Sequence, residues 1–286
     1  MFDNHVHTNL TEDSNATLEE YAERAVDIGL SAFTITNHCS LGRLKEDGWK
    51  VVARDFKKLE RDARIFSDKF GIDIKIGVEL DYFEDRKTQF KDVLDWFDFD
   101  IVLVSCHYLP PDFKVNCADR SSASFFEACT DIDHAYRRYY DNVRGCIDFL
   151  AQTRGDFVLA HLDLIKKYSA KFFEVPSVKD PFYFKLASGV VADLVHDNAK
   201  NIAAELNTRG FEHASKEPYP SKGILELLFT QGYKRITIGS DGHTVEGLGK
   251  YIPEGLSLLK EIGFKGVYDY EKCKPYFVSF SEPRFT

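Results

Sequence analysis

Side chains that bind metals and transfer protons stand at the ends of short apolar runs along this sequence. The first run ends in His5-Val6-His7, the second in Asn37-His38, and the third carries Glu79. The later runs end in His107, His161, Glu205-Leu206-Asn207 and Asp241-Gly242-His243. Neutral imidazole and carboxylate suit Zn, Mn and Fe. The pattern therefore indicates a metal centre.

The number of these donors favours more than one ion. A single histidine at the end of an apolar run means little, but six of them with two carboxylates are hard to explain structurally. Strand residues two apart share a face, so His5 and His7 can point at one centre. The donors exceed what one tetrahedral ion can hold, so we expect a site of two or three metals.

The apolar runs themselves read as strands. They are β-branched or aromatic and nearly continuous in apolar character, which is typical of parallel strands buried on both faces. The predicted strands are Phe2–His7, Ala32–His38, Asp73–Leu80, Ile101–His107, Phe157–His161, Ile202–Asn207 and Arg235–Asp241. Active sites of parallel α/β folds form at the carboxyl ends of the strands, where these side chains stand.

Amphipathic stretches between the runs predict helices. Thr17 and Glu20 make a capping box for a helix that Gly29 ends. Further helices are predicted over 51–70, 133–153, 181–199, 221–231 and 253–262. Seven strands with intervening helices indicate one α/β domain over 1–286, a β/α barrel of seven units. An open doubly wound sheet is the alternative.

Two segments do not fit this alternation. The long stretch Tyr108–Asp133 contains Pro110, Pro111 and a polar run, and such loops are usually lids or binding loops. A second irregular segment is expected at Lys171–Asp180.

Composition narrows the range of partners. The chain of 286 residues has a formal net charge of −9 and no basic stripe, so we expect no nucleic-acid partner. No apolar run approaches the roughly 18 residues of a membrane span. The six cysteines lack C-x-x-C spacing and no signal peptide is apparent, which predicts reduced thiols in a cytoplasmic protein. The sequence does not indicate an oligomeric state.

These motifs resemble the polymerase-and-histidinol-phosphatase (PHP) superfamily. They are His5-Val6-His7-Thr8, Thr36-Asn37-His38, Gly77-Val78-Glu79, Ser105-Cys106-His107, Ala160-His161 and Gly239-Ser240-Asp241-Gly242-His243, in the family's order. Within it, segments 161–168 and 205–210 are most similar to the monofunctional histidinol-phosphate phosphatases. The resemblance implies a distorted seven-stranded β/α barrel.

The resemblance also implies a trinuclear site of Zn, Mn or Fe. His5, His7, Glu79 and Asp241 would hold the first metal. Glu79 would bridge to a second metal, bound also by His107 and His161. His38 and His243 would hold the third.

Two positions depart from the family's pattern. Many relatives have a histidine where this chain has Asp13, and we assign Asp13 to the third metal because carboxylate is an acceptable ligand. The family's aspartate before the second-motif histidine is Asn37 here, which cannot carry charge and would instead orient a ligand or water.

The implied reaction is hydrolysis of L-histidinol phosphate, a step of histidine biosynthesis, by a metal-bound hydroxide attacking phosphorus. Glu79, Asp241 and His243 are the expected catalytic residues, with the proton shuttle either Asp241 or His243. Arg209 and Lys167, which follow strands of the site, are expected to bind the phosphate.

Two other functions remain open at this point. The same site would serve another sugar or nucleotide phosphate, or a phosphodiester. A non-catalytic metal-binding module is a third hypothesis, which the near-complete ligand set disfavours. Among the remaining histidines, His134 and His196 are predicted to be structural or solvated, and His213 to lie in a loop near the substrate.

Overall fold

Parallel strands form the frame of the molecule. The computed structural model describes residues 1–39, 41, 53–120 and 122–282. The strands of the frame are β1 (Phe2–Val6), β2 (Ala32–Ile35), β3 (His38–Cys39), β4 (Asp73–Ile76), β5 (Val78–Asp81), β6 (Val102–Ser105), β9 (Phe157–Leu159), β10 (Ile202–Asn207) and β11 (Ile236–Gly239). All pair in parallel, in the orders β1-β2-β4 and β11-β10-β9-β6-β5-β3. The predicted strands are thus present, each within a few residues of its expected bounds.

The two sheets close into one barrel. Strand β2 runs on into β3, and β4 into β5 after Gly77, where a Cβ would stand 2.5 Å from Ile101 Cγ2. At the other edge β1 meets β11: His7 N donates to Gly242 O at 2.8 Å, and Gly242 N donates to His5 O at 3.3 Å. The predicted distorted barrel with seven strand positions is confirmed, and the open doubly wound sheet is wrong.

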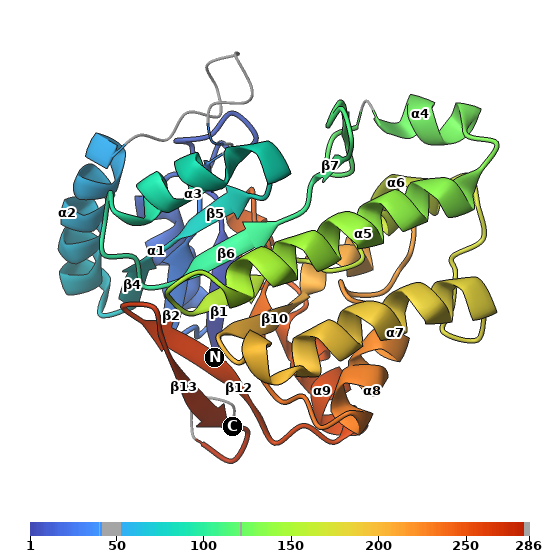
Figure 1. The fold of residues 1–286 in the computed structure, drawn as a ribbon. Coiled ribbons are helices and arrows are strands. Elements are labelled where there is room, and N and C mark those ends of the chain that lie inside the picture. Colours follow the sequence, from blue (N-terminus) through green and yellow to red (C-terminus); the bar gives the residue numbers. More distant parts are fainter. Residues whose placement is uncertain (40, 42–52, 121, 283–286) are drawn as a thin grey trace.

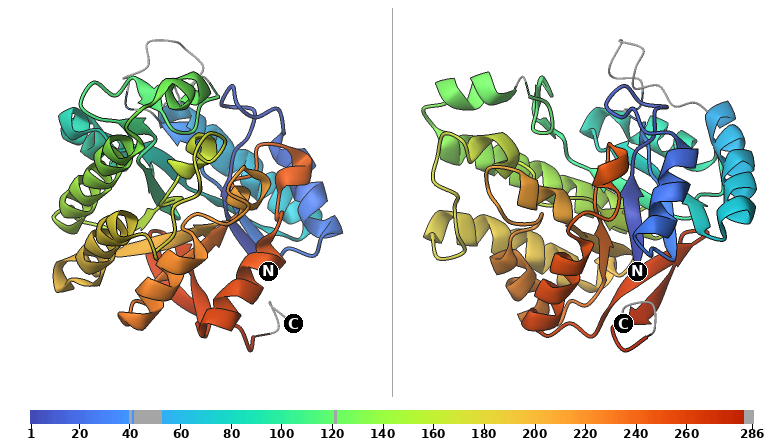
Figure 2. Two further views of the ribbon diagram at one scale, coloured as in Figure 1. Left: turned by 90° about the vertical axis from the view of Figure 1, so that its right-hand side faces the viewer. Right: turned by 180° about the vertical axis from the view of Figure 1, so that it is seen from behind.

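Helices cover the outside of this barrel (Figures 1 and 2). They are α1 (Leu18–Asp27), α2 (Ala53–Phe70), α3 (Lys87–Leu94), α5 (Ile132–Ala151), α7 (Pro181–Val195), α8 (Lys222–Thr230) and α9 (Ile252–Ile262). The capping box of α1 is present, since Glu20 N donates to Thr17 Oγ1 and Thr17 N donates to Glu20 Oε2. The other predicted helices occur within a few residues of their expected bounds, although positions 51 and 52 lie outside the described residues.

The segment expected to be an irregular loop, Tyr108–Asp133, is more ordered than predicted. It contains the short hairpin of β7 (Tyr108–Leu109) and β8 (Val115–Asn116), followed by α4 (Ser122–Ala128). Residue 121 lies outside the described part. Such short elements carry too few residues for a hydrophobic period to show in the sequence. By contrast, Lys171–Asp180 holds no helix or strand, as predicted.

A C-terminal hairpin closes the amino end of the barrel and was not predicted. Strands β12 (Gly266–Glu271) and β13 (Lys274–Ser279) pair antiparallel and lie at the lower end of the molecule in Figure 1. Tyr270, fully buried, packs with Ile101, Leu103 and Val158 from the strands above it. These side chains form a small apolar cluster at the amino end of the barrel.

The period of two along each strand divides the interior into an apolar and a polar half. Leu103, Ser105 and His107 alternate along β6 and its end, so they share one face, which turns polar toward the carboxyl end. On β10 the same succession runs from Ala203 to Glu205 and beyond. The fold therefore places the polar ends of seven strand positions around one centre.

Candidate metal centre

Nine potential metal donors lie together at the carboxyl end of the barrel. They form four overlapping groups in which the ligand atoms lie within 4.8 Å of one another. The groups are His7, Asp13, His38 and His243; His5, His7 and Asp241; His5, Glu79 and His161; and His38, Glu79 and His107. The structure thus brings together every residue that the sequence nominated as a metal ligand, from six strand ends and the loop after β1.

Glu79 stands at the centre of the cluster. Its Oε1 lies 2.8 Å from His161 Nε2 and 3.4 Å from His107 Nε2. Its Oε2 lies 2.9 Å from His38 Nδ1 and 3.2 Å from His5 Nε2. His7 Nε2 is also within 3.4 Å of Oε2. One carboxylate therefore faces five histidines from four strand positions, an arrangement that suits a ligand shared between two cations.

Asp13 reaches the cluster from the loop that follows β1. Its Oδ2 lies 2.7 Å from His243 Nε2 and 3.1 Å from His38 Nε2. The ring of His7 stacks against both of these rings, with centroids 4.3 Å from His38 and 4.2 Å from His243. Asp13 thus shares a group with the two histidines that were expected to accompany it.

Unpartnered atoms in this cluster test whether it suits cations. His7 Nδ1, Asp13 Oδ1 and His161 Nδ1 are buried and have no hydrogen-bond partner among the residues that the structure describes. Buried polar atoms are otherwise nearly always satisfied, and leaving one unsatisfied costs about 1–3 kcal/mol. The set of imidazoles and carboxylates, together with these atoms, fits divalent cations of the Zn, Mn and Fe type.

Two further carboxylates orient the histidines from outside the cluster. Glu205 Oε1 lies 2.7 Å from His5 Nδ1, and Asp81 Oδ1 lies 2.6 Å from His107 Nδ1. Such contacts fix the ring orientation and the tautomer, leaving the other nitrogen for a metal. Sequence reasoning noted Glu205 at its strand end without giving it this role and missed Asp81. The signal for Asp81 was its position two residues after Glu79, on the same face of the strand.

The charges in the cluster depend strongly on one another. Burial alone would raise the pKa of Glu79, but His38, His5 and His107 outweigh burial and hold that pKa well below its usual value. Burial, and then the neighbouring His243 and His38, lowers the pKa of His7 to about 3. His7 is therefore neutral at physiological pH, the form in which imidazole binds metals.

Asp241 connects the two sides of the cluster. Its Oδ1 lies 3.3 Å from His7 Nε2 and 3.4 Å from His243 Nδ1. Burial would raise its pKa, but His5 and the hydrogen bond from His7 hold the pKa well below its usual value. Asp241 is therefore an ionised carboxylate held between two histidines, of which His243 is 20% exposed on its side chain.

Basic side chains flank one side of the cluster. Arg209 lies in η4 (Thr208–Glu212), directly after β10, with its NH1 2.9 Å from Glu212 Oε2. Lys167 lies in α6 (Lys166–Ser169), and its Nζ donates to Ala118 O at 2.8 Å. Burial first, and then these two cations, lowers the pKa of His213 to about 3. Lys167 and Arg209 are therefore both close enough to His213 to act on its charge, and their role in binding the substrate stays a prediction.

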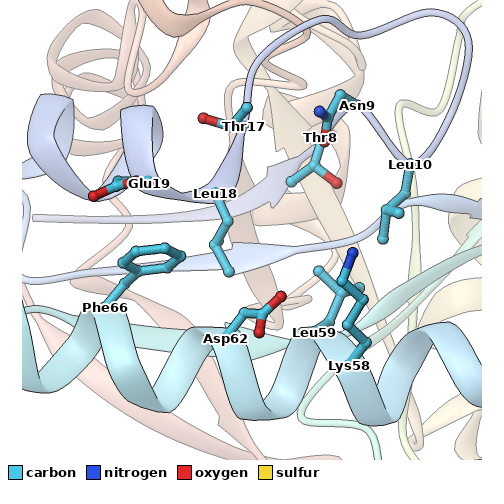
Figure 3. A pocket seen from close by; sticks show the side chains of 10 residues that line it. All are labelled: Thr8, Asn9, Leu10, Thr17, Leu18, Glu19, Lys58, Leu59, Asp62 and Phe66. Carbon is cyan, nitrogen blue, oxygen red and sulfur yellow. The ribbon is translucent and has the colours of Figure 1, made fainter.

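A separate groove lies beside the cluster, between α1 and α2. It has a volume of about 230 Å³, and Figure 3 shows Leu18, Phe66 and Leu59 among its lining side chains, with Lys58 and Asp62 along α2. None of the nine clustered residues lines it.

In the described part of the chain, no helix is long and apolar enough to cross a membrane.

Comparison with known proteins places this geometry in a family. The family model of the PHP domain matches residues 3–209, which is more than half of the chain. The chain therefore belongs to the PHP domain family.

Similar proteins cover between 59% and 96% of the chain. A probable histidinol-phosphatase of Deinococcus radiodurans is 27% identical over 285 residues, covering 96% of this chain and 99% of that protein. The histidinol-phosphatase of Bacillus subtilis is 30% identical over 184 residues, covering 59% of this chain and 68% of that protein. The histidinol phosphate phosphatase of Lactococcus lactis, solved with Zn, L-histidinol and phosphate, has a TM-score of 0.79 at 21% identity and covers 96% of this chain and 98% of that one. That structural likeness supports the same fold.

Proposed function

We propose that the protein is a metal-dependent phosphomonoesterase that hydrolyses L-histidinol phosphate to L-histidinol and phosphate. The observation that carries the proposal is the position of Glu79, whose two oxygens face five histidines inside a cluster of nine donors. The choice of substrate rests on the similar proteins. They are named histidinol-phosphatase or probable histidinol-phosphatase, and this chain matches them over almost their full length.

The cluster would hold two or three divalent ions. His5, His7 and Asp241 would bind one of them, and Glu79 would bridge it to a second held by His107 and His161. Asp13, His38 and His243 would bind the third. When bound, such ions neutralise the charge of a phosphate dianion and activate water as a nucleophile at neutral pH.

The chain's own residues would handle the proton. Asp241 Oδ1 faces His7 on one side and His243 Nδ1 on the other, at 3.3 and 3.4 Å. We assign proton transfer to the pair of Asp241 and His243. His243 would exchange the proton with solvent, since 20% of its side chain is accessible.

Arg209 and Lys167 would bind the phosphate group. A guanidinium matches two phosphate oxygens with its planar fork, whereas an ammonium acts as a point charge. Both lie on the same side of the cluster, because the charges of both lower the pKa of His213. Glu212, which pairs with Arg209 at 2.9 Å, holds the guanidinium in place.

The six cysteines are all free thiols, which suits the reducing environment of the expected cytoplasmic location. Histidine biosynthesis is the pathway that the proposed reaction would serve.

A screen for phosphate release tests the proposal. The protein would be reconstituted separately with Zn, Mn and Fe and offered histidinol phosphate beside sugar phosphates, nucleotides and a phosphodiester. We expect histidinol phosphate to give the highest kcat/KM. A rival phosphomonoester that exceeds it by tenfold or more would overturn the substrate, and no release from any compound would overturn the activity.

A further inference from the structure

Two consecutive lysines of α6 lie in very different surroundings. Lys167 lies with Arg209 on the side of the cluster that carries basic side chains, and its Nζ donates to Ala118 O. Lys166 is completely buried, with none of its side chain accessible. Its Nζ lies 2.8 Å from Asp163 Oδ2 and 2.8 Å from Glu217 Oε1. A buried lysine held by two carboxylates is rare and calls for a reason.

Asp163 fixes this lysine to the body of the protein. Its carboxylate is fully buried and accepts hydrogen bonds from Tyr140 at 2.9 Å and Tyr183 at 2.7 Å, which come from α5 and α7. Its backbone N donates to Tyr139 OH at 3.1 Å. Asp163 also has a positive φ of 84°, which costs energy outside glycine and persists because these contacts hold it.

Glu217 lies in a different loop, the one between η4 and α8. This loop, residues 213–221, begins with His213 and directly follows η4, which carries Arg209. It is anchored at its far end, because Tyr219 N donates to Asn207 O at 3.0 Å and Asn207 N donates to Tyr219 O at 2.7 Å. Between these points, the Lys166–Glu217 contact ties the loop to α6.

We propose that Lys166 is a positioning residue that ties α6 to the η4–α8 loop and so fixes Lys167 relative to Arg209 for binding the substrate's phosphate. The inference rests on the proposed function, because it assigns those two cations to the phosphate. Lys166 itself does not reach the substrate. It acts through the placement of its neighbour Lys167 and of the loop that Glu217 holds.

Cutting the link at Glu217 tests this without burying an unpaired charge. Lys166→Met would leave the Asp163 carboxylate without its ammonium and endanger the fold, whereas Glu217→Ala keeps that buried pair. Glu217 is 28% exposed on its side chain, so its removal is tolerable. Glu217→Gln keeps an oxygen that can accept from Lys166. Glu261→Ala, which removes an exposed carboxylate 2.6 Å from Lys222 Nζ, is the matched control.

The readouts are KM and kcat for histidinol phosphate and the Kd of inorganic phosphate measured by calorimetry on the metal-loaded protein. Small misplacements of binding groups have large effects, so we expect Glu217→Ala to raise KM and the phosphate Kd about 10-fold. We expect kcat to change less than KM, Glu217→Gln to restore most of the loss, and Glu261→Ala to match the wild type.

A double variant separates positioning from general loosening. In a Lys167→Met background there is no ammonium left to place, so Glu217→Ala should add little further weakening of phosphate binding. Equal factors in both backgrounds, or a Glu217→Ala protein equal to wild type, would overturn the inference while the phosphatase proposal stands. Wild-type protein that neither binds phosphate nor releases it from histidinol phosphate would overturn both.

Discussion

Two buried polar groups at opposite ends of the barrel differ in whether they are satisfied. At the amino end, Lys75 Nζ lies 2.7 Å from Asp269 Oδ2 and 3.1 Å from Tyr276 OH, and that hydroxyl donates to Asp269 at 2.5 Å. At the carboxyl end, buried atoms of His7 and His161 have no hydrogen-bond partner within the described part of the chain. Lys75 and Glu79 belong to the same run of chain, four residues apart.

The difference separates structure from function. The amino-end set of Lys75, Asp269 and Tyr276 satisfies itself within the protein and joins the C-terminal hairpin to β4. Glu205 and Asp81 orient histidines of the cluster from outside, yet His7 Nδ1, Asp13 Oδ1 and His161 Nδ1 find no hydrogen-bond partner among the described residues. A cluster with oriented histidines and unpartnered donor atoms suits a site in which cations take up the remaining donor atoms.

The largest expected effect comes from changing the centre of the cluster. Glu79→Gln keeps the volume but removes the charge that would bridge two ions, so we expect kcat to fall by about 10²- to 10³-fold or more. Circular dichroism and urea unfolding should show a largely intact fold. Near wild-type turnover would show that Glu79 does not bridge metals.

Breaking the amino-end set should lower the stability of the fold and leave turnover almost unchanged. Lys75→Met leaves Asp269 buried without its cation, and removing one partner of such a pair costs about 3–5 kcal/mol of unfolding free energy. Turnover per folded, metal-loaded molecule should stay within about twofold, because Lys75 lies far from the reaction. The control is Lys87→Met, whose exposed pair with Glu84 should cost less than about 1 kcal/mol. A Lys75→Met protein that is fully stable but inactive would contradict the division between the two ends.

A smaller effect is expected at the edge of the cluster. Losing a charged hydrogen bond typically costs about 1.5–3 kcal/mol, so Arg209→Ala should lower kcat/KM by roughly 10- to 200-fold with metal content unchanged. A fall in kcat would place the contact in the transition state, and a rise in KM alone would indicate uniform binding. If kcat/KM stays at the wild-type value, Arg209 does not bind the phosphate.

The smallest effect should come from the carboxylate that orients His5. Glu205→Gln keeps a hydrogen-bonding group but loses the charge, and changes of this kind weaken metal affinity by about 10- to 100-fold. Competition with a chelator measures this affinity directly. An unchanged affinity would mean that Glu205 serves only to support the backbone of His161, whose N donates to it at 2.8 Å.

The residues at the centre of the site could be predicted from the sequence better than the residues around it. The positions of His5, His7 and Glu79 follow from strand alternation and the carboxyl-end rule, which are local patterns. Asp13 lay in a loop and entered only through resemblance to a family. Asp81 went unnoticed, although its spacing from Glu79 was available.

Long-range packing could not be predicted in the same way. The partnership of Lys75 with Asp269 joins residues 194 positions apart, and the hairpin that brings it about continues after the last barrel helix. Likewise, no local pattern in the sequence distinguishes Lys166 from Lys167, because the surroundings of Lys166 depend on Glu217 in a distant loop. Contacts across the fold decide these cases, and a single sequence does not display them.

Metal content tests the central claim most directly. Protein purified gently, supplied with Zn, Mn or Fe and freed of excess ions would be analysed for bound metal per chain, with anomalous scattering to locate each ion. The account predicts two or three ions at the carboxyl end of the barrel, and loss of phosphate release when a chelator removes them. A protein that holds no more than one ion under these conditions would contradict it.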